Sequence, residues 1–404
     1  MAPVMEQILR LIPSITIQQA AQDTWDAIVI GAGPAGAVAA RQLAVRGLRV
    51  LLVERRSWPR HKVCGGCLNG RAISMLEDIG LSRVLENVSA VPLDRLHLQT
   101  WQRCVELKLP GGKAINRSQF DAAIMEAAIE AGVTFIADTT ALIAPQVATS
   151  DFRQVKLSHS NEKDVQVSAK LVIAADGLGH PSLRDLPEFA CHANPGSRVG
   201  LSTTVENLNS SYLTGVIYMA VSASGYVGLV RTAGGQGNLA AAIDSSVLKT
   251  AVETPDVVRQ ILTESGLPLP TFSSSNVWRG TIPLTRHTNR LSSHRVLLIG
   301  DAAGYTEPFT GEGIGWALKS AVAITPLAMR SIASWDPDAV SIWETNQKRQ
   351  MVRSQIFSRT AIGLLRRPLA VYLTIGLLRM LPALARPLVR QVYQSQHSID
   401  GKRQ

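Results

Sequence analysis

Cysteine and aromatic residues are scarce in this chain. Four of the 404 residues are cysteine and 5% are aromatic. So few cysteines, with no basic and apolar leader ahead of them, argue against a secreted protein held together by disulfides. The 46% of hydrophobic residues is enough for a substantial core. We therefore expect a folded protein on the cytoplasmic side, with room for one large or two ordinary domains.

A second pair of metal ligands is also missing. Cys64 and Cys67 form a C-x-x-C pair, but Cys104 and Cys191 stand alone. A structural zinc site needs four ligands, so we predict no metal. A redox-active disulfide between Cys64 and Cys67 remains an alternative, because such pairs occur where a helix N-terminus lowers one pKa. The favoured interpretation is that Cys64 belongs to a turn and that Cys67 is a small buried residue.

Acidic residues are nearly absent from the C-terminal end, although the formal net charge of the whole chain is +10. Residues 345–404 contain eleven Lys and Arg and a single acid, Asp400, so this segment accounts for the whole excess. The remainder of the chain is formally neutral. A generally basic DNA-binding surface is thereby disfavoured, and we predict no nucleic-acid partner.

Long uncharged apolar runs are missing from the same segment. The longest, 368–378, is too short to cross a bilayer. Prolines divide the segment into short helices, on which Arg379, Arg386 and Arg390 share one face. Such a basic amphipathic surface binds anionic lipid headgroups, which predicts peripheral contact with the inner face of a membrane. A helical cap packed on the protein, with its arginines in water, explains the pattern equally well, and the two can coexist.

Glycine is present where a buried strand ends near the N-terminus. In "WDAIVIGAGPAGAVAARQLAVRGLRVLLVERR" we expect a strand at 27–30, a helix at 34–46 and a second strand at 49–53. The turn between strand and helix has the G-x-G-x-x-G spacing, with glycines at Gly31, Gly33 and Gly36. This strand, turn, helix and strand predict a dinucleotide-binding unit.

Each glycine of the turn has a separate physical role. Gly31 permits the tight turn, Gly33 lets a pyrophosphate approach the main chain, and Gly36 lets the helix pack on the strand. Ala35 belongs to the same turn and is expected to contact the cofactor. Glu54 ends the second strand, where a carboxylate can accept hydrogen bonds from a ribose. Arg55 follows it and is a further candidate contact.

Two distant segments identify the dinucleotide. "KLVIAADGLGHPSLRD" (170–185) carries Asp176 after an apolar strand, and "HRVLLIGDAAGYTEPFTGEGIGWALKSA" (294–321) carries Gly300 and Asp301 in the same setting. With these residues the chain, over about 25–330, resembles the flavoprotein family that contains aromatic hydroxylases, flavin halogenases and geranylgeranyl reductases. The resemblance implies FAD as cofactor, with NAD(P)H as electron donor.

The resemblance also implies residue roles. Asp176 would lie near the pyrophosphate, and Asp301 would bind a ribitol hydroxyl. A helix is expected to start at Gly311, Glu312, Gly313 and Ile314. The positive end of that helix would lie at the pyrimidine side of the flavin. Arg117 matches the family's arginine at the start of a helix beside the cofactor, although an ordinary arginine at a helix start explains it as well.

The segment "PRHKVCGGCLNGRA" (59–72) resembles the Lys-x-Cys-Gly-Gly segment of geranylgeranyl reductases. The resemblance places Cys64, Gly65 and Gly66 against the isoalloxazine ring, as the residues nearest the chemistry. Short alternating runs at 93–109 and 198–244 are expected to form an antiparallel sheet over the ring. There "SGYVGLVR" keeps Tyr226 of the aromatic Y-x-W-x-F-P segment that shapes the lipid pocket of those reductases, but it lacks the tryptophan and the Phe-Pro.

We therefore predict an α/β protein in which a three-layer, Rossmann-like FAD-binding domain is interleaved with an antiparallel β-sheet substrate domain and followed by C-terminal helices. The predicted boundaries are 25–90, 112–186 and 280–330 for the FAD-binding domain, 91–111 and 187–279 for the substrate domain, and 331–404 for the helical, basic segment. The predicted activity is that of an FAD-dependent oxidoreductase on a hydrophobic, isoprenoid- or polyketide-like molecule, with double-bond reduction favoured. The alternatives are an NAD(P)H- and O₂-dependent monooxygenase of an aromatic or quinone-like ring, and a membrane-associated flavin electron-transfer module.

Overall fold

The first long strand is apolar over most of its length, and the fold buries it on both faces. β1 (Thr24–Ile30) runs parallel to β2 (Val50–Val53) on one side and to β9 (Val165–Ala174) on the other. A strand buried on both faces requires cover above and below the sheet. The computed structural model describes residues 14–387 and 389, apart from 59, 102, 147–149, 251–252, 274–275, 308 and 310.

β1 is central in an eight-stranded sheet, here called the first sheet. Six of its strands follow the order β17-β18-β9-β1-β2-β6, in which β18, β9, β1, β2 and β6 are parallel. β7 and β8 form a hairpin that continues antiparallel onto β9. The bounds of these further strands are β6 (Thr134–Ile136), β7 (Thr139–Ile143), β8 (Arg153–His159), β17 (Ser292–Ser293) and β18 (Val296–Leu298).

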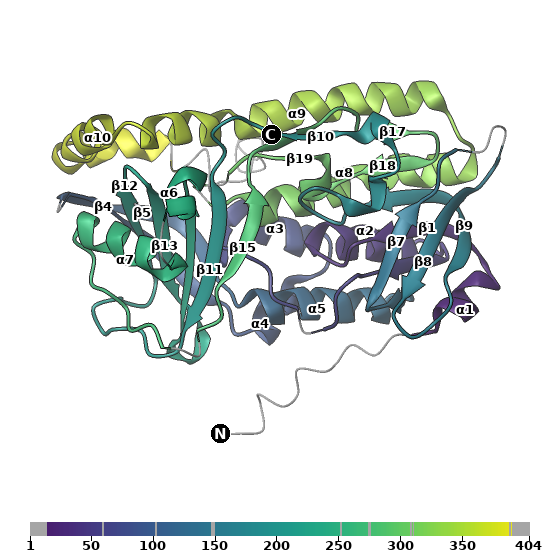
Figure 1. Ribbon diagram of the computed structural model, residues 1–404, viewed down its shortest axis with the longest axis horizontal. Helices are drawn as coiled ribbons and strands as arrows, with labels where there is room; N and C mark the ends of the chain where they lie inside the picture. The colour runs from purple at the N-terminus through teal and green to yellow at the C-terminus, as the bar shows by residue number, and fades with distance from the viewer. Residues whose placement is uncertain are drawn as a thin grey trace, which may run out of the picture.

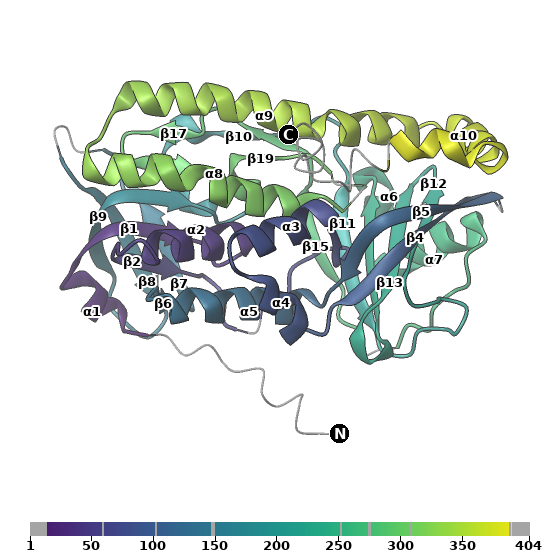
Figure 2. The same ribbon diagram turned by 180° about the vertical axis from the view of Figure 1, so that it is seen from behind.

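Helices cover one face of the first sheet and the β7–β8 hairpin lies toward the other (Figures 1 and 2). Val29 and Leu52 point to the helical side, while their neighbours Ile28 and Leu51 pack with the hairpin and with α1 (Ile17–Ala21). This alternation is what a period of two imposes on a central strand. The covering helices are α2 (Pro34–Ala44), α5 (Arg117–Glu130) and α8 (Gly313–Ala333).

A second eight-stranded sheet stands beside the first, in the order β15-β11-β14-β13-β12-β4-β5-β3. All its neighbours are antiparallel except β12 and β4. The strands are β3 (Cys67–Asn69), β4 (Val91–Thr100), β5 (Arg103–Ala114), β11 (Val199–Val205), β12 (Val216–Ser222), β13 (Gly225–Arg231), β14 (Gly237–Ile243) and β15 (Arg279–Pro283).

The second sheet is covered differently on its two faces. α7 (Thr254–Ser265) packs on one face, where Val258 and Ile261 meet Tyr218 and Leu229. The other face turns Ile217 and Met219 toward the C-terminal helices. This second face becomes the wall of the cavity described below.

The C-terminal segment is helical and joins the two sheets. α9 (Pro337–Leu365) lies along the edge of the molecule, and α10 (Pro368–Met380) continues it over the second sheet (Figures 1 and 2). Proline fixes φ and suits the first turn of a helix, which is why α10 begins at Pro368 and η5 (Pro382–Ala385) at Pro382. Within the described residues no single helix meets the length and hydropathy of a membrane span; one pair bent by 112°, Ser358–Leu365 with Leu369–Met380, does so jointly.

Short elements complete the described chain. A small antiparallel sheet has the order β10-β16-β19. The remaining elements are α3 (Gly70–Asp78), α4 (Ser82–Asn87), α6 (Ser245–Thr250), β10 (Cys191–Ala193), β16 (Arg286–Thr288), β19 (Gly304–Tyr305), η1 (Pro181–Leu183), η2 (Pro187–Phe189), η3 (Ala233–Gly235) and η4 (Gly300–Ala303).

The predicted fold class is confirmed: a Rossmann-like, three-layer body, an antiparallel sheet and C-terminal helices are all present. The domain boundaries stay a prediction. Two short strands that the sequence analysis assigned to the FAD-binding part, β3 and β15, hydrogen-bond into the second sheet instead. Each forms one end of that sheet, where a strand needs a partner on only one side.

Candidate active site

The predicted cofactor motifs meet because the strands that carry them are parallel neighbours in register. Ile30 of β1 lies opposite Val53 of β2 and Ala174 of β9, and Ala174 also lies opposite Leu298 of β18. These aligned residues stand one or two positions before the motifs, which start at Gly31, Glu54, Asp176 and Gly300. All four therefore lie at the carboxyl edge of the parallel sheet, the edge at which such folds bind ligands.

Two glycines of the first turn have no room for a side chain. Gly31 has φ +99°, and a Cβ there would lie 2.6 Å from the carbonyl oxygen of Ala175. A Cβ on Gly36 would lie only 1.9 Å from the carbonyl oxygen of Gly31. Backbone hydrogen bonds hold the turn against its neighbours, from Gly31 N to Val53 O at 2.7 Å and from Ala175 N to Ile30 O at 2.8 Å. The turn and the helix that follows are thus closely packed on the sheet.

The start of α2 is suited to an anion. Its N-cap is Gly33, which offers no side chain to the first N–H groups, and Pro34 follows it. These N–H groups carry the positive end of the helix dipole. The guanidinium of Arg60 adds charge, since its Nη2 lies 3.2 Å from where a Gly33 Cβ would be. Ala35 faces the Gly300 turn, with 2.8 Å between its Cβ and a Cβ placed on Gly300.

Glu54 is buried and already engaged. Its Oε2 accepts a hydrogen bond from Ala32 N at 2.9 Å, and its Oε1 accepts one from Arg56 N at 3.1 Å. These bonds fix the carboxylate beside the glycine turn and leave each oxygen a further lone pair for a ribose hydroxyl. Arg55 is exposed at the surface. Its role as a cofactor contact stays a prediction, as does that of Glu54.

Arg117 begins α5 and shares a buried carboxylate with Arg60. Its Nε and Nη2 donate to the two oxygens of Asp121 at 3.0 and 2.9 Å, and Arg60 Nη2 donates to the same carboxylate at 3.0 Å. Burial lowers the pKa of the Arg117 guanidinium, but Asp121 and then the thiol of Cys64 raise it by more, so the net shift is upward. Arg60 also lies 3.7 Å from Glu54, so the two guanidiniums are balanced by two carboxylates, and Arg117 is the member of this group that lines the cavity.

Asp301 and the turn before α8 lie across from Arg117. Lys62 Nζ donates to Asp301 Oδ2 at 3.0 Å, and both residues line the cavity together with Gly311, Gly313 and Ile314. Glu312 behaves differently: it is buried outside the cavity lining, and its Oε2 accepts a hydrogen bond from Ser358 Oγ of α9 at 3.2 Å. The carboxylate of Glu312 therefore joins the turn to α9.

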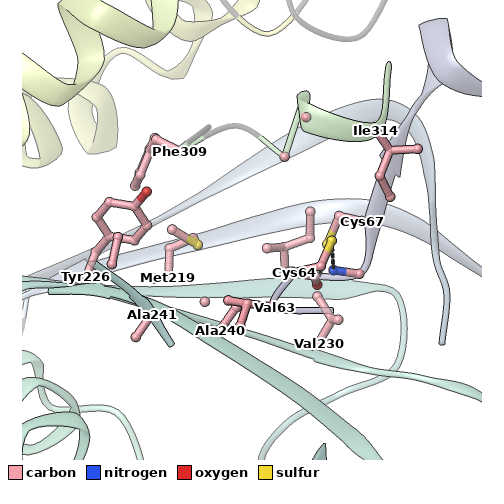
Figure 3. A pocket seen from close by; sticks show the side chains of 18 of the residues that line it. Val63, Cys64, Cys67, Met219, Tyr226, Val230, Ala240, Ala241, Phe309 and Ile314 are labelled. Atoms are coloured by element: carbon pink, nitrogen blue, oxygen red, sulfur yellow. Dashed lines mark hydrogen bonds between the residues drawn. The ribbon is translucent and has the colours of Figure 1, made fainter. Parts of the chain in front are cut away.

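The Cys64 segment passes along the cavity in a tight turn (Figure 3). Gly66 has φ +65°, and its N–H donates a hydrogen bond to Cys64 Sγ at 3.3 Å. Asn238 Nδ2 donates a hydrogen bond to the carbonyl oxygen of Cys64 at 3.0 Å. Cys64 and Cys67 are both free thiols. Burial, followed by the neighbouring Cys64, raises the pKa of Cys67 to about 12, which makes it a poor nucleophile. Cys67 is only partly buried and lines the cavity, so the expectation of a buried residue is corrected, while its raised pKa favours an unreactive thiol over a redox pair.

One cavity of about 300 Å³ connects these groups with the second sheet. Lys62, Arg117 and Asp301 are its charged members, and they come from the motif side. The remaining walls are mostly aliphatic. In Figure 3 Val230 and Ala240 project from the second sheet below the Cys64 segment, and Met219 lies to its side. Further apolar lining residues are Leu96, Leu98, Leu107, Leu109, Ile217, Leu229 and Leu284 from the sheet side, and Leu378, Ala385 and Val389 from the C-terminal helices.

Tyr226 connects the cavity with a buried ion pair. Its ring packs edge-on against Phe309, with 5.1 Å between centroids (Figure 3). The guanidinium carbon of Arg198 lies 5.6 Å from the same ring, and Arg198 Nη1 lies 3.4 Å from Glu307 Oε1. Burial raises the pKa of Glu307, and burial together with Glu307 raises the pKa of Tyr226 well above its usual value. Tyr226 therefore keeps its proton, and its hydroxyl is hydrogen-bonded to Glu307 beside the cavity.

Asp176 lies at the sheet edge with an unused oxygen. Oδ2 accepts a hydrogen bond from Ser182 N at 2.8 Å, whereas Oδ1 is shielded from solvent and has no hydrogen-bond partner within the described part of the chain. Burial raises its pKa to about 6, against the opposing effect of the Ser182 hydrogen bonds. His180 beside it has φ +28° and a buried Nδ1 with no hydrogen-bond partner there either. Unpartnered polar atoms at this edge indicate a place for a polar ligand.

These features fit the two ends of FAD. The glycine turn, the open start of α2 and the nearby arginines are chemistry for a pyrophosphate. The cavity that follows is lined by Asp301 and Gly311, the residues predicted to contact the flavin end. Among the described residues there is no group of three or more His, Cys, Asp or Glu side chains that would hold a metal ion.

Comparison with known proteins agrees with this fit. Residues 24–329 match the family of FAD binding domains, and the chain belongs to that family. It is an FAD-dependent oxidoreductase, as the sequence analysis predicted. The digeranylgeranylglycerophospholipid reductase of Methanosarcina acetivorans is 25% identical over 351 residues, covering 81% of each chain. The menaquinone reductase of Mycobacterium tuberculosis is 25% identical over 316 residues, covering 74% of this chain and 75% of that protein.

The flavin-dependent halogenase CmlS has a similar structure. Its TM-score is 0.71 at 21% identity, over 83% of this chain and 63% of that one. The chain thus spans less than two thirds of the halogenase's length. At this identity the likeness concerns the fold alone.

The predicted site residues fall into three groups. Cys64, Gly65, Gly66 and Tyr226 line the cavity with Arg117, Asp301, Gly311, Gly313 and Ile314. The residues at the carboxyl edge of the first sheet are Gly31, Gly33, Ala35, Gly36, Glu54, Asp176 and Gly300. Arg55 and the side chain of Glu312 lie apart from both groups. The cofactor contacts of all these residues stay predictions.

Three residues that shape the site were not predicted from the sequence. Asp121 could have been found, because it lies four residues after Arg117 on the expected helix, and oppositely charged residues at that spacing pair. Arg198 and Glu307 are 109 residues apart and carry no motif. Only the packing of the second sheet against the turn after β19 brings them together.

Proposed function

We propose that this oxidoreductase reduces a carbon–carbon double bond in a hydrophobic, isoprenoid-like molecule, with NAD(P)H as the electron source. One observation carries the proposal: the cavity that begins at the cofactor motifs ends between aliphatic walls of the second sheet and the C-terminal helices. Such walls bind a hydrocarbon chain by excluding water and offer it few polar contacts. The names of the two reductases quoted above support the same substrate class.

Different residues of the chain have different roles in such a reduction. Bound FAD supplies hydride chemistry at its ring. Gly65 and Gly66 keep side chains out of the way where the turn faces the cavity, and Gly66 cannot carry one because its Cβ would lie 2.7 Å from Ile115 O. Arg117 and Lys62, each paired with a carboxylate, line the cavity and would place N–H donors beside bound FAD.

Tyr226 is the residue that we propose as proton donor to the substrate. Its hydroxyl is protonated at neutral pH, since its pKa is raised by burial and by Glu307. In the reduction the double bond gains one hydride and one proton, and the electron pair comes from NAD(P)H. Glu307 and Arg198 act as positioning residues, because they touch Tyr226 and do not line the cavity.

Anaerobic turnover tests the reaction type. The FAD-loaded protein is incubated with NADPH or NADH and a polyprenyl quinone or a geranylgeranyl lipid in detergent, and the product is analysed by mass spectrometry. We expect turnover without oxygen and a product that carries two additional hydrogens. A product that forms only in air and contains an atom from labelled O₂ would instead establish the monooxygenase, the alternative that the shared fold allows.

A further control separates an enzyme from an electron-transfer module. If the flavin is reduced by NAD(P)H but no substrate is converted with or without oxygen, the module is the better description. The Tyr226→Phe variant serves as the matched control, because it removes the hydroxyl and keeps the ring that packs on Phe309. We expect normal flavin reduction and slower substrate conversion in this variant.

A further inference from the structure

The outward face of α10 is apolar, although the opposite face of the same helix is already buried. Val371 and Ile375 pack inward against the second sheet. On the other side four large apolar side chains of α10 are exposed, with Leu373 67% and Met380 80% accessible, and Leu381 and Leu384 just after the helix are exposed as well. These six residues, Leu369, Leu373, Leu377, Met380, Leu381 and Leu384, are here called the outer stripe of α10.

The outer stripe is ordered along the helix. Leu369, Leu373 and Leu377 follow at intervals of four, and Met380 follows at three, so they share one face of the helix. A helix in water normally presents polar residues on its outward side. Scattered exposed leucines need no explanation, whereas a continuous stripe beside a basic segment indicates a binding surface.

Exposed arginines flank the stripe. Arg367 precedes α10, Arg379 lies in its last turn, and Arg386 follows η5; all three are exposed. The segment 345–404 as a whole carries all of the excess positive charge of the chain. Aliphatic side chains framed by arginines complement a bilayer surface, where acyl chains lie beneath anionic phosphates.

We propose that the outer stripe of α10 docks on an anionic phospholipid bilayer and that the cavity draws its substrate from that membrane. The second part rests on the proposed function; the docking does not. The docking surface and the cavity are connected because they share α10. Leu378 of this helix lines the cavity, and its neighbour Leu377 belongs to the outer stripe. Figures 1 and 2 show α10 at the far end of the molecule, over β4 and β5.

Vesicle sedimentation tests the docking. The FAD-loaded protein is mixed with vesicles of phosphatidylcholine alone and with vesicles of equal parts phosphatidylglycerol and phosphatidylcholine. We expect strong binding to the anionic vesicles that weakens as salt is raised. The double variant Leu373→Glu/Leu377→Glu should bind them at least about 30-fold more weakly, since it replaces two leucines that enter the bilayer by two carboxylates.

The matched control is Leu213→Glu/Leu269→Glu. It removes two leucines of similar exposure, 51% and 47%, and adds the same charge outside α10. We expect this variant to bind like the wild type. Both double variants alter exposed side chains, and their flavin absorbance and melting temperature show whether they fold. Should either fail to fold, Arg379→Gln/Arg386→Gln provides a milder test, with binding to anionic vesicles reduced about tenfold or more.

Several results would overturn the docking proposal. Absence of binding by the wild type, or equal binding by the α10 variant, contradicts it directly. A dimer in analytical ultracentrifugation that Leu373→Glu/Leu377→Glu dissolves would show that a second copy covers the stripe. Binding that appears only after the chain is shortened to residue 389 would show that the last residues cover it. None of these measurements uses a substrate, so they stand apart from the test of the reaction.

Discussion

Replacing Asp176 with asparagine should stabilise the flavin-free protein at neutral pH. The carboxylate has one oxygen without a partner and a pKa raised from 3.8 to about 6. Each pH unit of difference corresponds to about 1.4 kcal/mol, so ionised Asp176 costs the folded state up to about 3 kcal/mol. Asparagine keeps an oxygen for Ser182 N and removes the charge.

The sign of the effect follows from linkage. A group whose pKa is raised on folding contributes stability below its unfolded pKa, and this contribution is lost as pH rises through the folded value. The wild type should therefore lose stability relative to Asp176→Asn between about pH 4 and pH 7. The two proteins should be equally stable at about pH 4, and the variant should lead by up to about 3 kcal/mol above pH 7.

Urea unfolding at a series of pH values measures this difference. Asp185→Asn is the matched control, because that carboxylate is exposed nine residues along the chain and should give no pH-dependent gain. Repeating the experiment with saturating FAD adds a second readout: a partner for Oδ1 from the cofactor would shrink the gain. A gain that does not vary with pH, or a less stable variant at pH 7.5, would refute the reasoning.

The remaining predictions concern other parts of the site. Gly36→Ala should destabilise the fold by about 3 kcal/mol or more and abolish FAD retention, since its Cβ would lie 1.9 Å from a carbonyl oxygen, whereas Gly363→Ala in open space on α9 should be neutral or stabilising in thermal melts. Asp301→Ala should weaken FAD binding in a titration followed by flavin fluorescence; a fully loaded variant would exclude its predicted role. Cys67 should react with iodoacetamide at pH 8 far more slowly than a free thiol, and rapid labelling on peptide mapping would contradict a pKa near 12. Tyr226→Phe should lower kcat for substrate conversion at least about tenfold with little change in flavin reduction, and equal rates would remove Tyr226 from the chemistry.

The sequence predicts best those parts of the site that obey local rules. The turn at Gly31 and the strands around it follow from period and glycine spacing, and the parallel register then brings the later motifs to the same edge. The helix start at Arg117, which the family resemblance implied, is confirmed, and its local cause is that Asn116 before it caps the helix. These features depend on a few neighbouring residues each.

Long-range packing decides what the sequence left open. No local pattern pairs Arg198 with Glu307 or directs the carboxylate of Glu312 to Ser358, because each partner lies on a different element. The tail shows the same limit. The sequence predicted its helices and the prolines that begin them. Arg390, one of the three arginines expected on one face, lies outside the described residues. The outer stripe could not be predicted, because it depends on which face of α10 is buried.

The helix α9 acts as a brace between the two halves of the molecule. Glu344 near its beginning accepts a hydrogen bond from Leu291 N at 3.1 Å beside the first sheet, and Arg366 at its end pairs with Asp244 beside the second at 3.4 Å. With 29 residues it is about 43 Å long. The spacing between the two sheets is thus tied to the length of α9, which also reaches the cavity through Ala361 and Glu312 through Ser358. Shortening α9 by a single turn would therefore change both that spacing and the cavity wall.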